Sequence, residues 1–232
     1  MSGLDKSRQH VLLQLSEALS VAGRRSDTCQ LIAVSKTFPA SDVRELYACG
    51  QRAFGENYVQ ELEQKHAELA DLVELEWHFI GPLQSNKTRS VAQIAHWVHS
   101  VDRLKIAERL SVQRPVGLPP LNVLVQVNVS GESSKSGCLP DEAAALCRAV
   151  VALPGLALRG LMCIPEATTD ELQLAQRFDV MQHLLTDLRA KGLSVDTLSM
   201  GMSADMALAV QHGATMVRVG TAIFGRRHYP DA

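Results

Sequence analysis

The sequence predicts an α/β protein in which eight parallel strands close into a single (β/α)8 TIM barrel, with one extra helix at the N-terminus. Eight short apolar or alternating segments recur along the chain, and segments with helical periodicity alternate with them. The length of 232 residues suits one barrel of this kind. No linker-like stretch divides the chain, so we expect residues 1–232 to form a single domain.

A doubly wound open sheet is the alternative. Such a sheet more usually has roughly five to seven strands and a glycine-rich first turn. Here the first strand ends in Lys36-Thr37-Phe38-Pro39 instead. The sequence therefore favours the closed barrel.

The chain opens with a predicted helix at 4–22, in which Val11, Leu15 and Leu19 recur at helical spacing and which Gly23 can end. The predicted strands are 31–35, 52–55, 76–80, 97–101, 121–129, 156–163, 196–199 and 215–219. The predicted helices between them are 41–49, 57–69, 84–95, 102–112, 140–152, 170–190 and 204–211, and a last helical turn is expected at 221–224.

Two of these helices carry clear apolar stripes. In 57–69 the stripe is Val59, Leu62, His66 and Leu69. In 170–190 it is Leu174, Phe178, Met181, Leu185 and Leu188, which is too short a repeat for a coiled coil and indicates a face packed on a core.

Composition excludes several classes of protein. The net charge is −2, so nucleic-acid binding is not expected. No run of 18 apolar residues is present, and the first residues lack the apolar core of a signal peptide, so no membrane segment is expected. The five cysteines are widely spaced without a metal-binding or disulfide pattern. A cytoplasmic protein is the simplest interpretation.

Lys36 is the first candidate functional residue. It follows the apolar run Leu31-Ile32-Ala33-Val34, at the point where a buried strand gives way to a loop. Active sites of barrels lie at the carboxyl ends of the strands. A lysine in a partly dry pocket loses proton affinity and becomes an amine nucleophile toward carbonyl groups. A solvated lysine at the end of a strand is the alternative.

The seventh and eighth strands end in two similar segments. Gly201-Met202-Ser203 and Gly220-Thr221 each place a glycine and a hydroxyl side chain between a strand and a predicted helix. Barrels commonly bind phosphate at these two loops, with backbone N–H groups as donors. Two ordinary glycine turns are the alternative.

Arg218 is expected to point into the barrel. In Met216-Val217-Arg218-Val219, alternation places Arg218 on the face opposite the two valines, which suit packing against outer helices. A buried guanidinium needs acceptors. Either an inward carboxylate or a ligand could supply them.

These groups together suit one compact ligand. An amine at the first strand, an anion cradle at the seventh and eighth, and a guanidinium between them match an aldehyde, a phosphate and a ring acceptor. Pyridoxal 5'-phosphate (PLP) has this layout, and lysine forms a Schiff base with it.

At these residues the sequence closely resembles the pyridoxal phosphate homeostasis protein family. The matching segments are AVSKT (33–37), FGENYVQ (54–60), WHFIGPLQSNK (77–87), SKSG (134–137), RGLM (159–162), GMS (201–203) and MVRVGTAIFG (216–225). They follow one another in order over almost the whole chain.

The resemblance implies a fold like the N-terminal barrel of alanine racemase. It implies that Lys36 forms a covalent Schiff base with PLP, that Ser203, Gly220 and Thr221 lie near the phosphate, that Arg218 faces the ring nitrogen, and that Asn57 lies close to the ring. Met202 is expected among the cofactor-binding residues as well. The resemblance also implies a role in vitamin B6 and amino-acid homeostasis, with no established reaction.

A PLP-dependent racemase or decarboxylase with the same fold is the competing interpretation. Arginine keeps its proton, so a ring nitrogen facing Arg218 stays largely unprotonated and the ring is a poor electron sink. Racemases that resemble this arrangement add a C-terminal β domain with a tyrosine base. Here Tyr229 is a candidate by residue type alone, and a solvated surface residue in the tail is the alternative. We therefore expect a monomeric PLP carrier, with apo PLP enzymes as candidate recipients and Lys135 as an open candidate in transfer.

Overall fold

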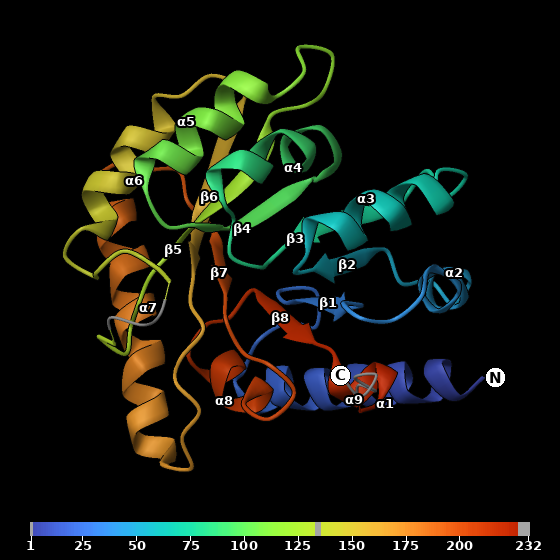
Figure 1. Cartoon of the computed structure of the whole chain (residues 1–232). Coiled ribbons are helices and arrows are strands. Elements are labelled where there is room, and N and C mark those ends of the chain that lie inside the picture. The colour runs from blue at the N-terminus through green and yellow to red at the C-terminus, as the bar shows by residue number, and fades with distance from the viewer. Residues whose placement is uncertain (1, 133–135, 227–232) are drawn as a thin grey trace.

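The computed structural model describes residues 2–132 and 136–226, and in it eight parallel strands form a closed barrel in the order β1 to β8 (Figure 1). The strands are β1 (Gln30–Val34), β2 (Ala53–Glu56), β3 (Glu76–Phe79), β4 (Trp97–Val101), β5 (Leu121–Gln126), β6 (Leu156–Met162), β7 (Thr197–Ser199) and β8 (Met216–Val219). β1 pairs with β8, which closes the ring and confirms the predicted barrel.

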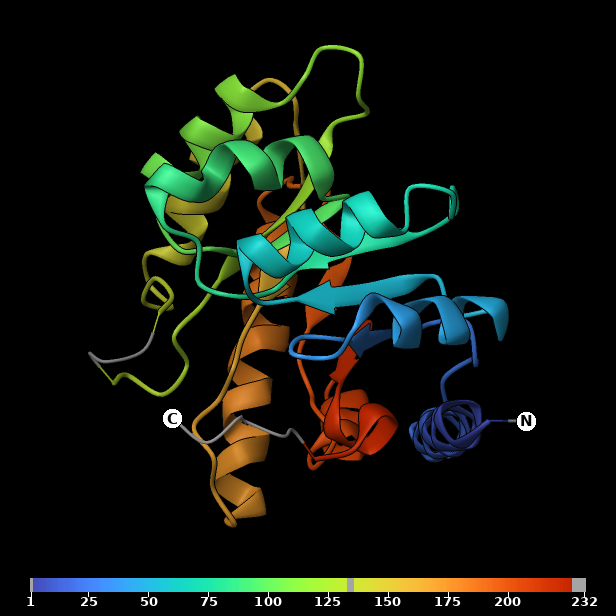
Figure 2. The same ribbon diagram turned by 45° about the vertical axis from the view of Figure 1, so that its right-hand side comes forward.

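The helices cover the outside of this barrel. They are α1 (Gly3–Val21), α2 (Ala40–Ala48), α3 (Val59–Glu68), α4 (Thr88–Ile94), α5 (Leu104–Gln113), α6 (Ala143–Val151), α7 (Glu171–Ala190), α8 (Met206–Gln211) and α9 (Thr221–Phe224), with a 3-10 turn at Ser85–Lys87. The extra helix α1 lies against α8 and α9, so the first helix packs beside the last two helices of the described chain on one side of the barrel (Figures 1 and 2). Within the described ranges, none of the helices combines the length and apolar character that crossing a bilayer requires.

Two apolar layers hold the barrel together. The inner one consists of strand side chains that point toward the barrel axis, namely Ile32, Ala53, Trp97, Leu124, Met162 and Met216. The outer one lies between strands and helices, and it includes the predicted faces of α1 and α7. This division follows from strand alternation, because every second side chain faces inward.

Several predicted boundaries were too long. β5 ends at Gln126 rather than 129, because Val127 pairs with Cys138 and the Asn128 side chain binds the backbone of the following loop. α6 begins at Ala143 rather than 140, after a turn in which Glu142 accepts from the N–H of Leu139. α8 begins at Met206 rather than 204.

The stripe predicted for the third helix was also wrong at one position. His66 is exposed, and Lys65 is buried in its place between Leu62 and Leu69. A lysine on the core-facing side of a helix requires acceptors, and these prove to lie beside Lys36.

Candidate functional site

A cavity of about 250 Å³ opens at the carboxyl ends of the strands. All seven residues singled out from the sequence line it, namely Lys36, Asn57, Met202, Ser203, Arg218, Gly220 and Thr221. Four further lining residues were not anticipated: Val34, Ile80, Ile164 and Ala204. Three of these are apolar side chains at or just past the end of a strand, a position that could have identified them.

Closure of the barrel brings the two main candidates together. Lys36 follows β1, and Arg218 lies on β8, the neighbouring strand, where it is in register with Ile32. Lys36 is partly exposed and sits in a tight turn in which Phe38 N–H donates to the Ser35 carbonyl, 3.1 Å away. The alternative of a fully solvated lysine is therefore wrong, since Lys36 lines the cavity.

Arg218 points into the barrel, as alternation predicts, and only 4% of it is exposed. Its guanidinium donates to Ser199 Oγ at 2.6 Å and to the Cys163 carbonyl at 2.9 Å. Among the described residues no carboxylate forms an ion pair with it. Burial lowers the pKa of Arg218, but an arginine stays protonated. Its two hydrogen-bond partners are thus neutral, the Asp205 carboxylate acts on it only through space, and the side chain lines the cavity.

A line of polar side chains continues from Arg218 through the barrel interior. Ser199 Oγ lies 2.8 Å from His99 Nδ1, His99 Nε2 lies 3.0 Å from His78 Nδ1, and His78 Nε2 lies 2.8 Å from Glu76 Oε1. Burial, followed by the nearby His78 and Arg218, holds the pKa of His99 well below its ordinary value. His99 is therefore neutral beside the guanidinium.

One arrangement of protons that fits these contacts runs away from Arg218. Arg218 can only donate, so Ser199 Oγ accepts from it and has its own proton available for His99 Nδ1. In that arrangement His99 carries its proton on Nε2 and donates to His78 Nδ1. The Ser199 oxygen then stays oriented toward the guanidinium.

The opposite end of the cavity presents backbone donors. The N–H groups of Ser203, Ala204 and Thr221 donate to no acceptor within 2–132 and 136–226. The N-cap of α8 is Asp205 rather than Ser203, and its carboxylate accepts from Met202 N–H at 2.5 Å. An anion at this end would find these backbone donors.

Asn57 forms a further part of the wall. Its Oδ1 atom is buried and has no hydrogen-bond partner within the described residues. Gly81 holds this segment closely, because a Cβ at residue 81 would lie 2.1 Å from the Asn57 carbonyl oxygen. A buried acceptor without a protein donor is open to a donor from a ligand or from an ordered water molecule.

Three other polar residues at or near the strand ends do not line the cavity. His78 is in the barrel interior, Glu56 points outward toward α3, and Asn128 organises the loop after β5 through Ser130, Gly131 and Glu132. Lys135 and Tyr229 fall outside the described residues.

Comparison with known proteins identifies relatives over the whole length. Residues 12–228 match the family of the alanine racemase N-terminal domain. The pyridoxal phosphate homeostasis protein of Pseudomonas aeruginosa is 58% identical over 229 residues, covering 99% of this chain and 98% of that protein.

Two solved structures are also similar. PipY of Synechococcus elongatus, whose structures are without PLP and with PLP bound, is 41% identical with a TM-score of 0.80, covering 91% of this chain and 100% of that chain. An unknown protein from Bifidobacterium adolescentis is 34% identical with a TM-score of 0.91, covering 96% of this chain and 94% of the other.

Proposed function

The chain belongs to the pyridoxal phosphate homeostasis protein family, built on the alanine racemase N-terminal domain, and we propose that it binds PLP covalently through Lys36. The observation that carries this proposal is the single cavity that brings an amine, a guanidinium and unpartnered backbone donors together. The bound PLP of PipY supports it.

The residues present fit the chemical groups of PLP. The amine of Lys36 would condense with the aldehyde, forming a C=N bond and releasing the carbonyl oxygen as water. Arg218 would donate to the ring nitrogen, and Asn57 would lie beside the ring. The backbone at Ser203, Gly220 and Thr221, with Met202 over it, would hold the phosphate.

We further propose that the protein stores and delivers PLP without turnover. When bound, PLP supplies an electron sink that is stronger when its ring nitrogen is protonated, and the permanently protonated Arg218 disfavours that state. The same reasoning does not favour racemase or decarboxylase activity, although the fold is shared with alanine racemase. We propose a cytoplasmic, single-domain monomer that transfers PLP to apo PLP enzymes, and no nucleic acid or membrane partner.

Borohydride reduction followed by peptide mapping tests the covalent proposal. Wild-type protein loaded with PLP should carry the label on Lys36 and absorb near ~420 nm. Lys36→Ala should lose both signals. Lys105→Ala, which removes an exposed lysine of α5, is the matched control and should keep both. Labelling of another lysine with Lys36 unmodified would contradict the proposal.

Turnover assays test the carrier proposal separately. The loaded protein should neither racemise nor decarboxylate common amino acids at a rate above that of free PLP. Robust turnover that disappears in Lys36→Ala would replace the carrier proposal with an enzymatic one.

A further inference from the structure

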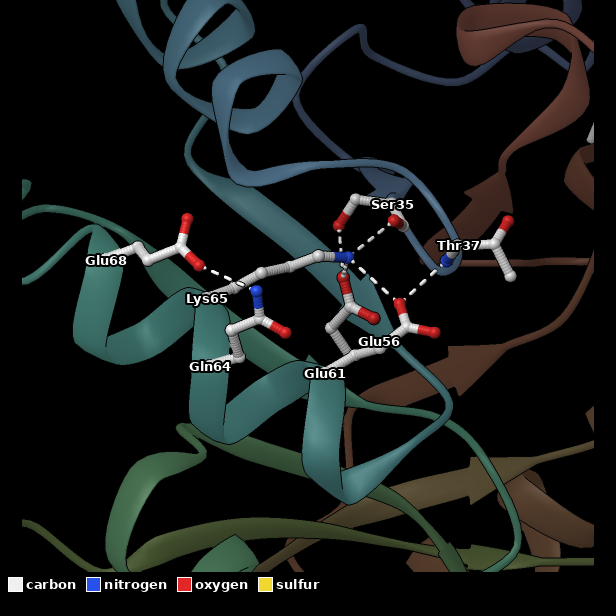
Figure 3. Close-up of polar contacts among 7 residues, drawn as sticks. All are labelled: Ser35, Thr37, Glu56, Glu61, Gln64, Lys65 and Glu68. Atoms are coloured by element: carbon white, nitrogen blue, oxygen red, sulfur yellow. Dashed lines mark hydrogen bonds and ion pairs between the residues drawn. The ribbon is translucent and has the colours of Figure 1, made fainter.

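A buried cation lies just behind Lys36. The Nζ atom of Lys65 on α3 donates to the Ser35 carbonyl at 2.7 Å, to Glu56 Oε1 at 2.6 Å and to Glu61 Oε2 at 3.1 Å (Figure 3). The side chains of Lys65 and Glu56 are 6% and 0% exposed. We call Glu56, Glu61 and Lys65 the carboxylate clamp.

The carboxylate clamp holds both neighbours of Lys36. On one side, Ser35 donates through Oγ to Glu56 Oε1 at 2.6 Å and accepts from Lys65 through its carbonyl. On the other side, the Thr37 N–H donates to Glu61 Oε2 at 2.7 Å. Figure 3 shows these contacts converging on the turn from the α3 side.

Thr37 explains why such support is needed. Its φ angle is +69°, and among the described residues it is the sole non-glycine with a positive φ. β-Branched residues strongly disfavour this left-handed region, and a turn with positive φ at its third position normally carries glycine. A strained residue of this kind persists only where its surroundings determine its conformation.

A stability role does not account for the carboxylate clamp well. Burying a lysine with carboxylates loses hydration, and a well-packed apolar replacement is often as stable. Its contacts are instead specific to the turn, because they reach the carbonyl of Ser35 and the N–H of Thr37.

We propose that Glu61 and Lys65, together with Glu56, are positioning residues for Lys36: they hold the Ser35–Phe38 turn in the conformation that presents the Lys36 amine to the cavity. This inference rests on the proposed function, in which Lys36 is the residue that binds PLP. Within it, α3 determines the reactivity of a residue in the turn that follows β1.

The test compares four variants with wild-type protein. Glu61→Ala removes the acceptor of the Thr37 N–H, Thr37→Gly removes the strain that makes the acceptor necessary, and the double variant combines them. The control is Glu68→Ala, since Glu68 lies on the same helix and its carboxylate contacts Gln64 at the surface (Figure 3).

Two measurements are made on each variant. In protein without PLP, hydrogen exchange of the peptide containing residues 35–38 should be faster in Glu61→Ala and unchanged in Glu68→Ala. With PLP, the rate of borohydride-trapped labelling at Lys36 should fall roughly fivefold to tenfold in Glu61→Ala. The double variant should regain most of the labelling rate, because glycine adopts the left-handed conformation without support.

The outcomes separate the two proposals. If wild-type protein is not labelled at Lys36, the proposed function fails. If wild-type protein is labelled and Glu61→Ala matches it in both labelling and exchange, the positioning role alone is overturned. A labelling defect in Glu61→Ala that Thr37→Gly does not relieve would also overturn it.

Discussion

Two buried cations, Lys65 and Arg218, lie beside the same cavity, and they have opposite kinds of partner. Lys65 has two carboxylate partners, Glu56 and Glu61, so its charge is compensated inside the protein. Arg218 has a hydroxyl and a carbonyl as partners, and behind them a neutral histidine.

The difference indicates what each cation is for. The carboxylates beside Lys65 cancel most of the electrostatic attraction that its charge would have for a ligand in the cavity. Lys65 is therefore left to organise the backbone around it. A buried charge with neutral partners remains available to an acceptor that enters from outside. Under the proposed function, Lys65 therefore organises the protein backbone and Arg218 is available to bind the ligand. Four predictions test this contrast.

The largest expected effect is on stability, in Lys65→Met. Removing one partner leaves Glu56 buried without its cation, which should lower the free energy of unfolding by ~3–5 kcal/mol. Chemical denaturation at about pH 8, above the raised pKa of Glu56 so that its carboxylate is ionised, measures this value. Lys105→Met, at an exposed position of α5, should change it by less than ~0.5 kcal/mol. If the two variants are equally stable, the ion pairs of Lys65 with Glu56 and Glu61 do not contribute to the free energy of unfolding.

The second prediction concerns pH. Burial, opposed by Lys65 and Ser35, raises the pKa of Glu56 from 4.5 to about 7. Between these values the unfolded carboxyl has lost its proton while the folded one retains it, so the unfolded state binds fewer protons. The contribution of Glu56 to stability is therefore fully present below pH ~4.5 and is lost as the pH rises through about 7.

Unfolding free energies of wild type and Glu56→Gln, measured from pH 4.5 to 7.5, check this sign. Their difference should change by up to ~1.4 kcal/mol per pH unit within the window, with wild type losing stability as the pH rises. Parallel curves for the two proteins would contradict the raised pKa.

The third prediction concerns the affinity for PLP. Arg218→Glu should weaken PLP binding by ~1–3 kcal/mol, because the ring acceptor loses its donor. An absorbance titration measures the affinity. Arg44→Glu, which changes a surface arginine paired with Asp71, is the control and should bind as wild type does. If Arg218→Glu binds PLP with the affinity of wild type, Arg218 does not contact the ligand.

The smallest effect is expected for Ser199→Ala. This change removes one acceptor of Arg218 and should reduce PLP affinity by ~0.5–1.5 kcal/mol, with stability little changed. Ser100→Ala is a close control, because Ser100 is also buried on β-structure and its Oγ has no partner within the described residues. If both variants bind PLP equally well, the polar line behind Arg218 does not orient it.

Residues on strands with regular alternation could be predicted from the sequence. The inward direction of Arg218 follows from its valine neighbours, and the placement of Lys36 follows from the apolar run before it. Because the barrel closes in chain order, the expected meeting of the first, seventh and eighth strands at one cavity also came out as predicted.

The remainder depends on contacts between segments far apart in the sequence. Glu56 ends a strand beside Asn57, yet the two side chains go to opposite sides, one to Lys65 and one to the cavity. His99 was not singled out, since nothing near it in the chain indicates that Ser199 and His78 lie on either side of it. The positive φ of Thr37 likewise has no local signal, because its support comes from Glu61 on α3.

The pairing of β1 with β8 has a consequence for biosynthesis. The seam between these strands joins the earliest and latest strands of the barrel to be made, and the two cations of the proposed PLP site lie on its two sides. During translation, a nascent chain lacking β8 therefore has the lysine but neither the guanidinium nor the proposed phosphate-binding backbone at Gly220 and Thr221. Capacity to bind would arise in a single step, when the final strand docks, rather than growing gradually as the ribosome advances.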